Sequence, residues 1–184
     1  CIRDRSYTGL TFENITFDGS NSYDSDGNIV NYTWDFCDGN FSYEQNPVHS
    51  YSTSGIFNVT LTVTDDDGFT DSNTTTANIT LDSDGDGVSD EKEIEIGSNP
   101  FKKDITISKI DERTFYLIDS DDDEIPDRFY DTTTGKDATI KVLDDGTILI
   151  DVDGDGKWDY IFNPAKGTTD TYEEEKPEEE FPWL

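Results

Sequence analysis

Hydrophobic and polar residues alternate along short stretches of the first 81 residues. Residues 57–64 and 30–36 each place an apolar side chain at every second position, and shorter stretches at 15–17 and 77–81 do the same. A period of two is typical of β-strands with one buried face. Clusters of Asp, Ser, Gly and Asn separate the four stretches, so the pattern predicts a β-sandwich. The expected inward residues of the two longer strands are Phe57, Val59, Leu61 and Val63, and Val30, Tyr32, Trp34 and Phe36.

The second half of the chain contains an internal repeat with an offset of 32 residues. Residues 117–135 align without gaps on residues 149–167, and each copy reads strand, Asp-rich loop, strand and turn. Apolar stretches at 138–143 and 147–150 flank Asp144-Asp-Gly146, a sequence that favours a β-hairpin. We therefore expect a small β module over residues 103–168 and an all-β chain.

The first 81 residues also carry a specific set of motifs. Trp34-Asp-Phe-Cys-Asp-Gly39 ends a longer matching run that begins at Phe17, and Asn46-Pro-Val-His-Ser-Tyr51 and residues 55–65 follow it. On these motifs, residues 8–81 resemble the PKD domain, an immunoglobulin-like β-sandwich common on archaeal, bacterial and animal surface proteins. The family has Gly where this chain has Cys37, at a point where the backbone turns tightly.

Several residues of this domain could have either a functional or a structural role. His49 could be an acid–base group or a metal ligand, but no second His or nearby nucleophile accompanies it, so we assign it to the family's His-x-Tyr structural motif. Tyr32, Trp34 and Phe36 could stack on sugars, but their inward phase favours a place in the core. Cys37 is expected to be a small buried residue.

The composition narrows the classes of function. The chain has 184 residues, and 13 Lys and Arg against 43 Asp and Glu give a formal net charge of −30. This charge argues against nucleic-acid binding, because contacts with phosphates need a basic face. No apolar run approaches the ~18 residues of a membrane span. One His and two Cys offer little for zinc or a disulfide framework, and no phosphate-loop, Gly-x-Ser-x-Gly or His-Glu-x-x-His motif is present. We predict that no enzyme lies within this chain.

The first Asp-rich loop matches a twelve-residue calcium loop at each ligand position. Ca²⁺ takes several oxygen ligands at about 2.3–2.6 Å, and alternate Asp residues can present them to one centre. Gly87 stands at the sharp turn. A strand ending at Leu81 precedes the loop, so it is not an EF-hand, and we expect a short helix over residues 91–96 that ends at Gly97. The predicted ligands are Asp82, Asp84, Asp86, the carbonyl of Val88, Asp90 and a bidentate Glu93.

This loop continues into Gly97-Ser-Asn-Pro100. With that continuation, the segment of residues 82–102 is similar to the prokaryotic thrombospondin type-3 calcium repeat. The resemblance implies a calcium-binding linker that follows a surface sandwich domain.

The other two Asp-rich loops are less complete. Position 12 is Tyr130 in the second loop and Phe162 in the third, and Glu124 replaces Gly in the second, so another group or water must complete the metal shell. The alternative is a solvated acidic turn, but three alternate Asp on one short loop repel one another at neutral pH, which favours a cation. About three Ca²⁺ sites are therefore predicted. The further ligands would be Asp119, Asp121, Asp123, the carbonyl of Ile125 and Asp127, and Asp151, Asp153, Asp155, the carbonyl of Lys157 and Asp159.

Six Asn-x-Ser/Thr triplets fall within residues 1–81, whereas both Asn residues of the second half precede Pro. Several of these Asn residues lie on the outward phase of their strands, where a glycan can be accommodated. Incidental Asn/Thr alternation on exposed strands is the alternative. The predicted glycosylation sites are Asn14, Asn31, Asn40, Asn58, Asn73 and Asn78, and they indicate an extracellular or cell-surface location.

The two ends of the chain look different from the rest. Residues 1–5 match the in-frame translation of a transposon end used to build sequencing libraries, so we expect residues 1–7 to be a sequencing scar and a truncated start. A lipidated Cys1 is the alternative, and a disulfide between Cys1 and Cys37 has little support. Residues 169–184 are acidic and contain Pro, as expected of an extended linker.

Three functions fit these features. The chain would be a calcium-stiffened, noncatalytic spacer or adhesion segment of a surface protein, an accessory region of a secreted protease or glycosidase, or a subunit of an extracellular filament or surface layer that joins copies by strand addition. Expected partners are other surface proteins, polysaccharide or further copies of the chain. Flanking sequence would discriminate between the three.

Overall fold

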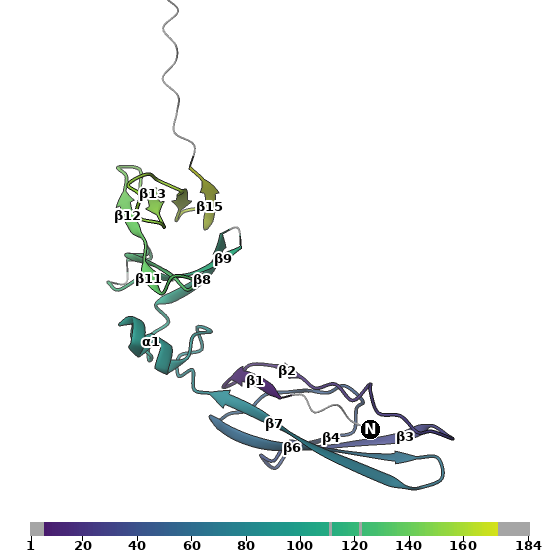
Figure 1. Ribbon diagram of the computed structural model, residues 1–184. Helices are drawn as coiled ribbons and strands as arrows, with labels where there is room; N and C mark the ends of the chain where they lie inside the picture. Colours follow the sequence, from purple (N-terminus) through teal and green to yellow (C-terminus); the bar gives the residue numbers. More distant parts are fainter. Residues whose placement is uncertain (1–5, 111, 122, 173–184) are drawn as a thin grey trace, which may run out of the picture. The chain divides into compact units, whose positions relative to one another are not determined.

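The computed structural model describes residues 6–110, 112–121 and 123–172. The chain divides between Lys103 and Asp104 into two compact units (Figure 1). The predicted scar at Cys1–Arg5 and most of the acidic tail lie outside the described residues. No helix in the described part is long and apolar enough to cross a membrane.

The first unit begins with a sandwich of a five-stranded and a two-stranded sheet. The larger sheet has the order β1-β7-β6-β3-β4, in which β1 pairs parallel to β7, and the smaller one pairs β2 with β5. This arrangement confirms the predicted immunoglobulin-like sandwich. The strands are β1 (Tyr7–Leu10), β2 (Ile15–Thr16), β3 (Ile29–Asp35), β4 (Phe41–Ser42), β5 (Val48–His49), β6 (Gly55–Asp65) and β7 (Thr70–Thr80).

Aromatic side chains fill the core of the sandwich. The ring of Phe17 lies 5.1 Å from that of Phe36 and 5.6 Å from that of Trp34, and all three residues are buried. Tyr32 packs against this core, which confirms that these aromatics are structural. The inward face predicted for β6 is also confirmed.

The prediction for Val30 was wrong, because its side chain is 62% exposed. The register between β3 and β6 shifts between Ile29 and Asn31. This β-bulge adds one residue to β3 and reverses the inside–outside phase at its start. Ile29 therefore packs against the core in place of Val30.

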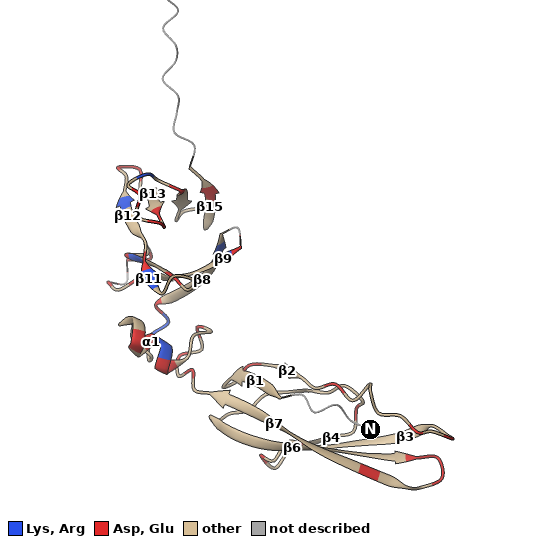
Figure 2. Cartoon of the chain, viewed as in Figure 1, with Lys and Arg blue, Asp and Glu red and all other residues tan. Residues whose placement is uncertain are grey.

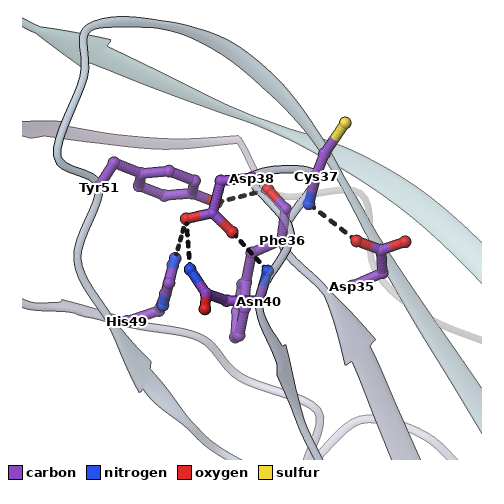
Figure 3. A network of polar contacts seen from close by, with 7 residues as sticks. All are labelled: Asp35, Phe36, Cys37, Asp38, Asn40, His49 and Tyr51. Atoms are coloured by element: carbon purple, nitrogen blue, oxygen red, sulfur yellow. Dashed lines mark hydrogen bonds and ion pairs between the residues drawn. The ribbon is translucent and has the colours of Figure 1, made fainter.

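His49 takes part in a structural network at the end of the sandwich (Figure 3). Its Nε2 lies 2.8 Å from Oδ2 of Asp38, and its ring stacks on Phe36 at 4.0 Å between centroids. The Asn40 amide donates to Oδ1 of Asp38 at 3.0 Å, and the Tyr51 hydroxyl donates to the Phe36 carbonyl at 3.2 Å. These contacts confirm the structural assignment of His49 and tie the turn after β3 to β5.

Cys37 is exposed, so the expectation that it is buried was wrong. Its φ is 62°, in the left-handed region, and its amide donates to Oδ1 of Asp35 at 2.9 Å. The tight turn after β3 keeps the conformation that suits Gly, and it directs the Cys37 thiol away from the Asp38–His49 pair (Figure 3). A side chain in this conformation costs roughly 1–2 kcal/mol.

The second unit contains two four-stranded antiparallel sheets, with orders β11-β10-β9-β8 and β12-β13-β14-β15. Each copy of the sequence repeat lies within one of them. Each Asp-rich loop connects the second and third strands of its sheet. The strands are β8 (Ile105–Ile110), β9 (Arg113–Ile118), β10 (Arg128–Asp131), β11 (Lys136–Asp137), β12 (Thr139–Val142), β13 (Ile148–Asp151), β14 (Tyr160–Asn163) and β15 (Thr168–Thr171).

The two sheets of this unit share one core. Phe115, Leu117 and Phe129 come from the first sheet. Ile148, Ile150 and Phe162 come from the second, and the rings of Phe129 and Phe162 lie 5.4 Å apart. The apolar face of each sheet is thus buried against the other.

We expect Cys37→Gly to raise the free energy of unfolding by about 1 kcal/mol, because Gly adopts the left-handed conformation without steric cost. Thermal unfolding measures this gain. Cys37→Ala is the control, since it removes the thiol but keeps Cβ, and it should leave stability close to that of the natural chain. Equal gains from both variants would contradict the assignment of strain to the backbone.

A second prediction concerns Asp38, whose side chain is 16% exposed. Burial raises the pKa of Asp38, but hydrogen bonds from Asn40 and the contact with His49 outweigh it and lower the pKa below the ordinary 3.8. A lowered folded-state pKa adds stability above pH 3.8 and loses it as the pH falls through the folded-state value. Asp38→Asn should therefore cost on the order of 1 kcal/mol at pH 7. In melting curves taken between pH 7 and pH 2, the difference from the natural chain should shrink with acidification; a constant difference would contradict the prediction.

Candidate metal sites

The first Asp-rich loop follows β7 and leads into the helix α1 (Asp90–Ile96). The Ser89 side chain caps the start of α1 by accepting a hydrogen bond from the Lys92 amide, and Gly97 ends it with φ 75°. This confirms the short helix predicted to stop at Gly97. Asp90 and Glu93, at loop positions 9 and 12, belong to α1, so the helix positions one side of the site.

Carboxylate groups converge in this loop. Oxygen atoms of Asp82, Asp84 and Asp86 all lie within 4.8 Å of one another, and an oxygen of Glu93 lies within the same distance of Asp86. Glu93 is 0% exposed and Asp82 4% exposed. Burying ionised carboxylates is costly unless opposite charge compensates them. Ca²⁺ bound among these oxygens would supply that charge.

The three Asp-rich loops share one pattern of hydrogen bonds. The sequence repeat relates only the second and third loops, so the match of the first loop is a finding of the structure. At position 6, the amides of Gly87, Glu124 and Gly156 each donate to the Asp at position 1, at 3.0–3.1 Å. At position 2, an amide donates to the Asp at position 9 in each loop, at 2.7–2.8 Å. At position 7, an amide donates to the Asp at position 5, at 2.8–2.9 Å. The backbone thus wraps the carboxylates in the same way three times.

The second and third loops bring together the Asp residues at positions 1, 3 and 9. The oxygens of Asp119, Asp121 and Asp127 lie within 4.8 Å of one another, as do those of Asp151, Asp153 and Asp159. Three predicted ligands do not belong to these clusters: Asp123 and Asp155 at position 5, and Asp90 at position 9 of the first loop. Each accepts the same backbone hydrogen bond as its counterparts in the other loops. The carbonyls of Val88, Ile125 and Lys157 remain predicted ligands.

Mutual repulsion is visible in the second loop. The negative charges of Asp123 and Asp127 raise the pKa of Asp121 above its ordinary value, and Asp119 adds to the effect. Figure 2 shows acidic residues on α1 and in the second unit, and also at the β6–β7 turn of the sandwich. A bound divalent cation would relieve this repulsion.

A contact that the sequence did not reveal attaches the first loop to the sandwich. The Thr11 hydroxyl donates to the Asp82 carbonyl at 3.0 Å, and the Asp82 amide donates back to the Thr11 hydroxyl at 3.1 Å. Both bonds are buried. The two residues are 71 positions apart in the chain, so no local pattern could have indicated this pair. It fixes the residue at loop position 1 to the end of the sandwich.

The predicted glycosylation sites lie on the sandwich. Asn14, Asn31, Asn40, Asn58 and Asn78 are exposed, whereas Asn73 is half-buried in β7. Glycosylation of these residues stays a prediction.

Comparison with known families identifies the first unit. Residues 7–81 match the model of the PKD domain, and residues 82–103 match the model of the bacterial TSP3 repeat. The chain therefore carries a PKD domain followed by a bacterial TSP3 repeat. The order is the one predicted from the motifs. PKD domains and TSP3 repeats are noncatalytic accessory modules.

The PKD domain has relatives among collagenases and a metalloprotease. It is 47% identical over 73 residues to collagenase ColQ1 of Bacillus cereus, a match covering 40% of this chain and 8% of the collagenase. It is 45% identical over 62 residues to a microbial collagenase of Vibrio alginolyticus, covering 34% and 8%. It is 52% identical over 58 residues to the pre-pro-metalloprotease PrtV of Vibrio cholerae, covering 32% and 6%. The chain thus spans less than a tenth of these relatives.

Solved structures of PKD domains are also similar. The PKD1 domain of Vibrio anguillarum Epp is 44% identical, with a TM-score of 0.33, and the match covers 33% of this chain and 73% of that one. The PKD1 domain of the Vibrio cholerae metalloprotease PrtV is 39% identical, with a TM-score of 0.32, covering 39% and 96%.

The shared hydrogen-bond pattern makes a prediction about Glu124, which has φ 67° where Gly87 and Gly156 occupy the same loop position. Glu124→Gly should tighten calcium binding in the second loop about fivefold, because it removes the cost of the left-handed conformation, roughly 1 kcal/mol. Calorimetric titration of Ca²⁺ measures the change. Glu124→Gln, which removes only the charge, is the matched control. A gain from Glu124→Gln as large as that from Glu124→Gly would contradict the role of the backbone.

Proposed function

We propose that this chain is a calcium-stabilised, noncatalytic accessory region of a larger extracellular protein. The observation that carries the proposal is the identical backbone wrapping of carboxylates in three loops, the first of which lies in a TSP3 repeat. The acidic clusters in each loop are compatible with Ca²⁺, a hard cation that prefers carboxylate oxygens. Metal binding would complete the fold of each loop and stiffen its connection to the strands on either side.

In the first unit, the position of the loop supports a spacer role. The Thr11–Asp82 hydrogen bonds fix the start of the loop to the sandwich, and the Asp90 amide donates to the Leu81 carbonyl at 3.0 Å. A cation held between Asp82 and Glu93 would lock α1 to the same end of the sandwich. The TSP3 repeat would then extend rigidly from the PKD domain.

A secreted protease is the favoured larger protein. The relatives described above are collagenases and a metalloprotease. Their identities of 45–52% apply to the PKD domain, so the proposal concerns the class of protein in which the module occurs. The catalytic domain would lie outside this chain.

Calcium should raise the melting temperature of the chain. At a free Ca²⁺ concentration ten times Kd, each site adds about 1.4 kcal/mol of stability. Asp84→Asn combined with Asp86→Asn should abolish the calcium-dependent stabilisation that the first loop contributes. The contributions of the other two loops should remain. Scanning calorimetry with Ca²⁺ and with a chelator measures each contribution.

A matched control removes two negative charges from residues outside the three loops. Asp144→Asn with Asp170→Asn changes two exposed carboxylates outside the three loops. This pair should retain the whole calcium response. A chain whose melting temperature does not respond to Ca²⁺ would refute the proposed function.

A further inference from the structure

An apolar groove lies in the first unit, between the end of the sandwich and α1. It has a volume of about 490 Å³, within the usual range of ligand-binding clefts. Gly55 at the start of β6 and Leu81 just after β7 line one wall. Ile94, with Asp90 and Glu91, lines the other.

Large apolar side chains are exposed in this groove. Ile94 is 68% exposed and Leu81 44% exposed, whereas Ile96, the other apolar residue near the end of α1, is buried. The helix therefore buries Ile96 and presents Ile94 to the groove. Covering both exposed side chains would remove apolar surface from water, which favours binding of an apolar group.

The rim of the groove is negatively charged. Asp90 and Glu91 lie on the α1 side, and residues 82–103 contain seven acidic residues against three Lys. An apolar floor with an acidic rim fits a segment that has a large apolar side chain between cationic ones. Acidic or uncharged segments with the same apolar residue lack this complementarity.

One wall of the groove depends on the first calcium loop. Asp90 and Glu93 occupy loop positions 9 and 12, and both belong to α1. The Asp90 amide donates to the Leu81 carbonyl at 3.0 Å, which attaches the start of α1 and the end of the loop to the end of β7. Without a cation, repulsion among the carboxylates opposes closure of the loop.

We propose that this groove binds an extended peptide segment with one large apolar residue flanked by Lys or Arg, and that it does so when calcium is bound in the first loop. The inference rests on the proposed function for its calcium dependence. The expected chemistry is burial of the apolar side chain between Leu81 and Ile94, with a cationic neighbour at the exposed Glu91.

The test uses the full chain and a fluorescent seven-residue peptide, Gly-Lys-Lys-Leu-Lys-Lys-Gly, followed by fluorescence anisotropy. Binding should be at least tenfold tighter with Ca²⁺ than with a chelator. Ile94→Glu should weaken it at least tenfold. Ile56→Glu is the matched control, because Ile56 is 72% exposed on β6 and does not line the groove. Leu81→Gln is a second groove variant, and circular dichroism verifies the fold of all three.

Calorimetry of Ca²⁺ on the same samples separates the two proposals. If no Ca²⁺ binds, the proposed function fails, and the calcium dependence of the groove fails with it. If Ca²⁺ binds but the peptide binds equally with chelator, the groove inference alone is overturned. It is also overturned if Ile94→Glu binds like the natural chain, or if a peptide with Glu in place of each Lys binds equally well.

Discussion

Repulsion between carboxylates is the constraint on which the calcium-loop parts of this chain depend. In each Asp-rich loop, three carboxylate oxygens lie within 4.8 Å of one another. Two unit charges at that distance repel by roughly 3 kcal/mol at an effective dielectric constant of 20. The hydrogen bonds from the backbone amides offset part of this repulsion, and a divalent cation at the centre would reverse its sign. The β-strands on either side supply rigid points from which the loops can hold this geometry.

The same loop conformation occurs in two structural contexts. The first loop joins the last strand of a sandwich to a short helix, which supplies a buried Glu93 as an additional carboxylate. The second and third loops join two strands of a four-stranded sheet, where position 12 is a core aromatic residue, Tyr130 or Phe162. The loops therefore share a backbone path and differ in their last ligand. That difference makes the first site the most complete of the three.

Much of this organisation was predictable because it depends on local patterns. The alternation in residues 57–64 identified the inward face of β6, and the spacing of Asp82, Asp84 and Asp86 identified the loop that clusters them. The prediction that Val30 points inward was wrong because of a β-bulge. The bulge depends on the pairing of β3 with β6, and the sequence of β3 alone does not reveal it. The prediction for Cys37 was wrong because it relied on the apolar character of Cys, whereas the exposure follows from a left-handed turn. The family's Gly at this position was the sign of that turn. The Thr11–Asp82 bonds join residues distant in sequence, and so does the ion pair at 3.1 Å between Arg113, which is 38% exposed, and the buried Asp131. Single-sequence reasoning therefore did not find them.

Counting the ions bound per molecule shows whether the loops bind calcium. Native mass spectrometry of the full chain, prepared free of metal and then equilibrated with millimolar Ca²⁺, measures the number of ions per molecule. The account predicts species with up to three Ca²⁺, of which the last to fill and the first to be lost is the second loop's ion. A spectrum that shows the metal-free mass alone under these conditions would contradict the account.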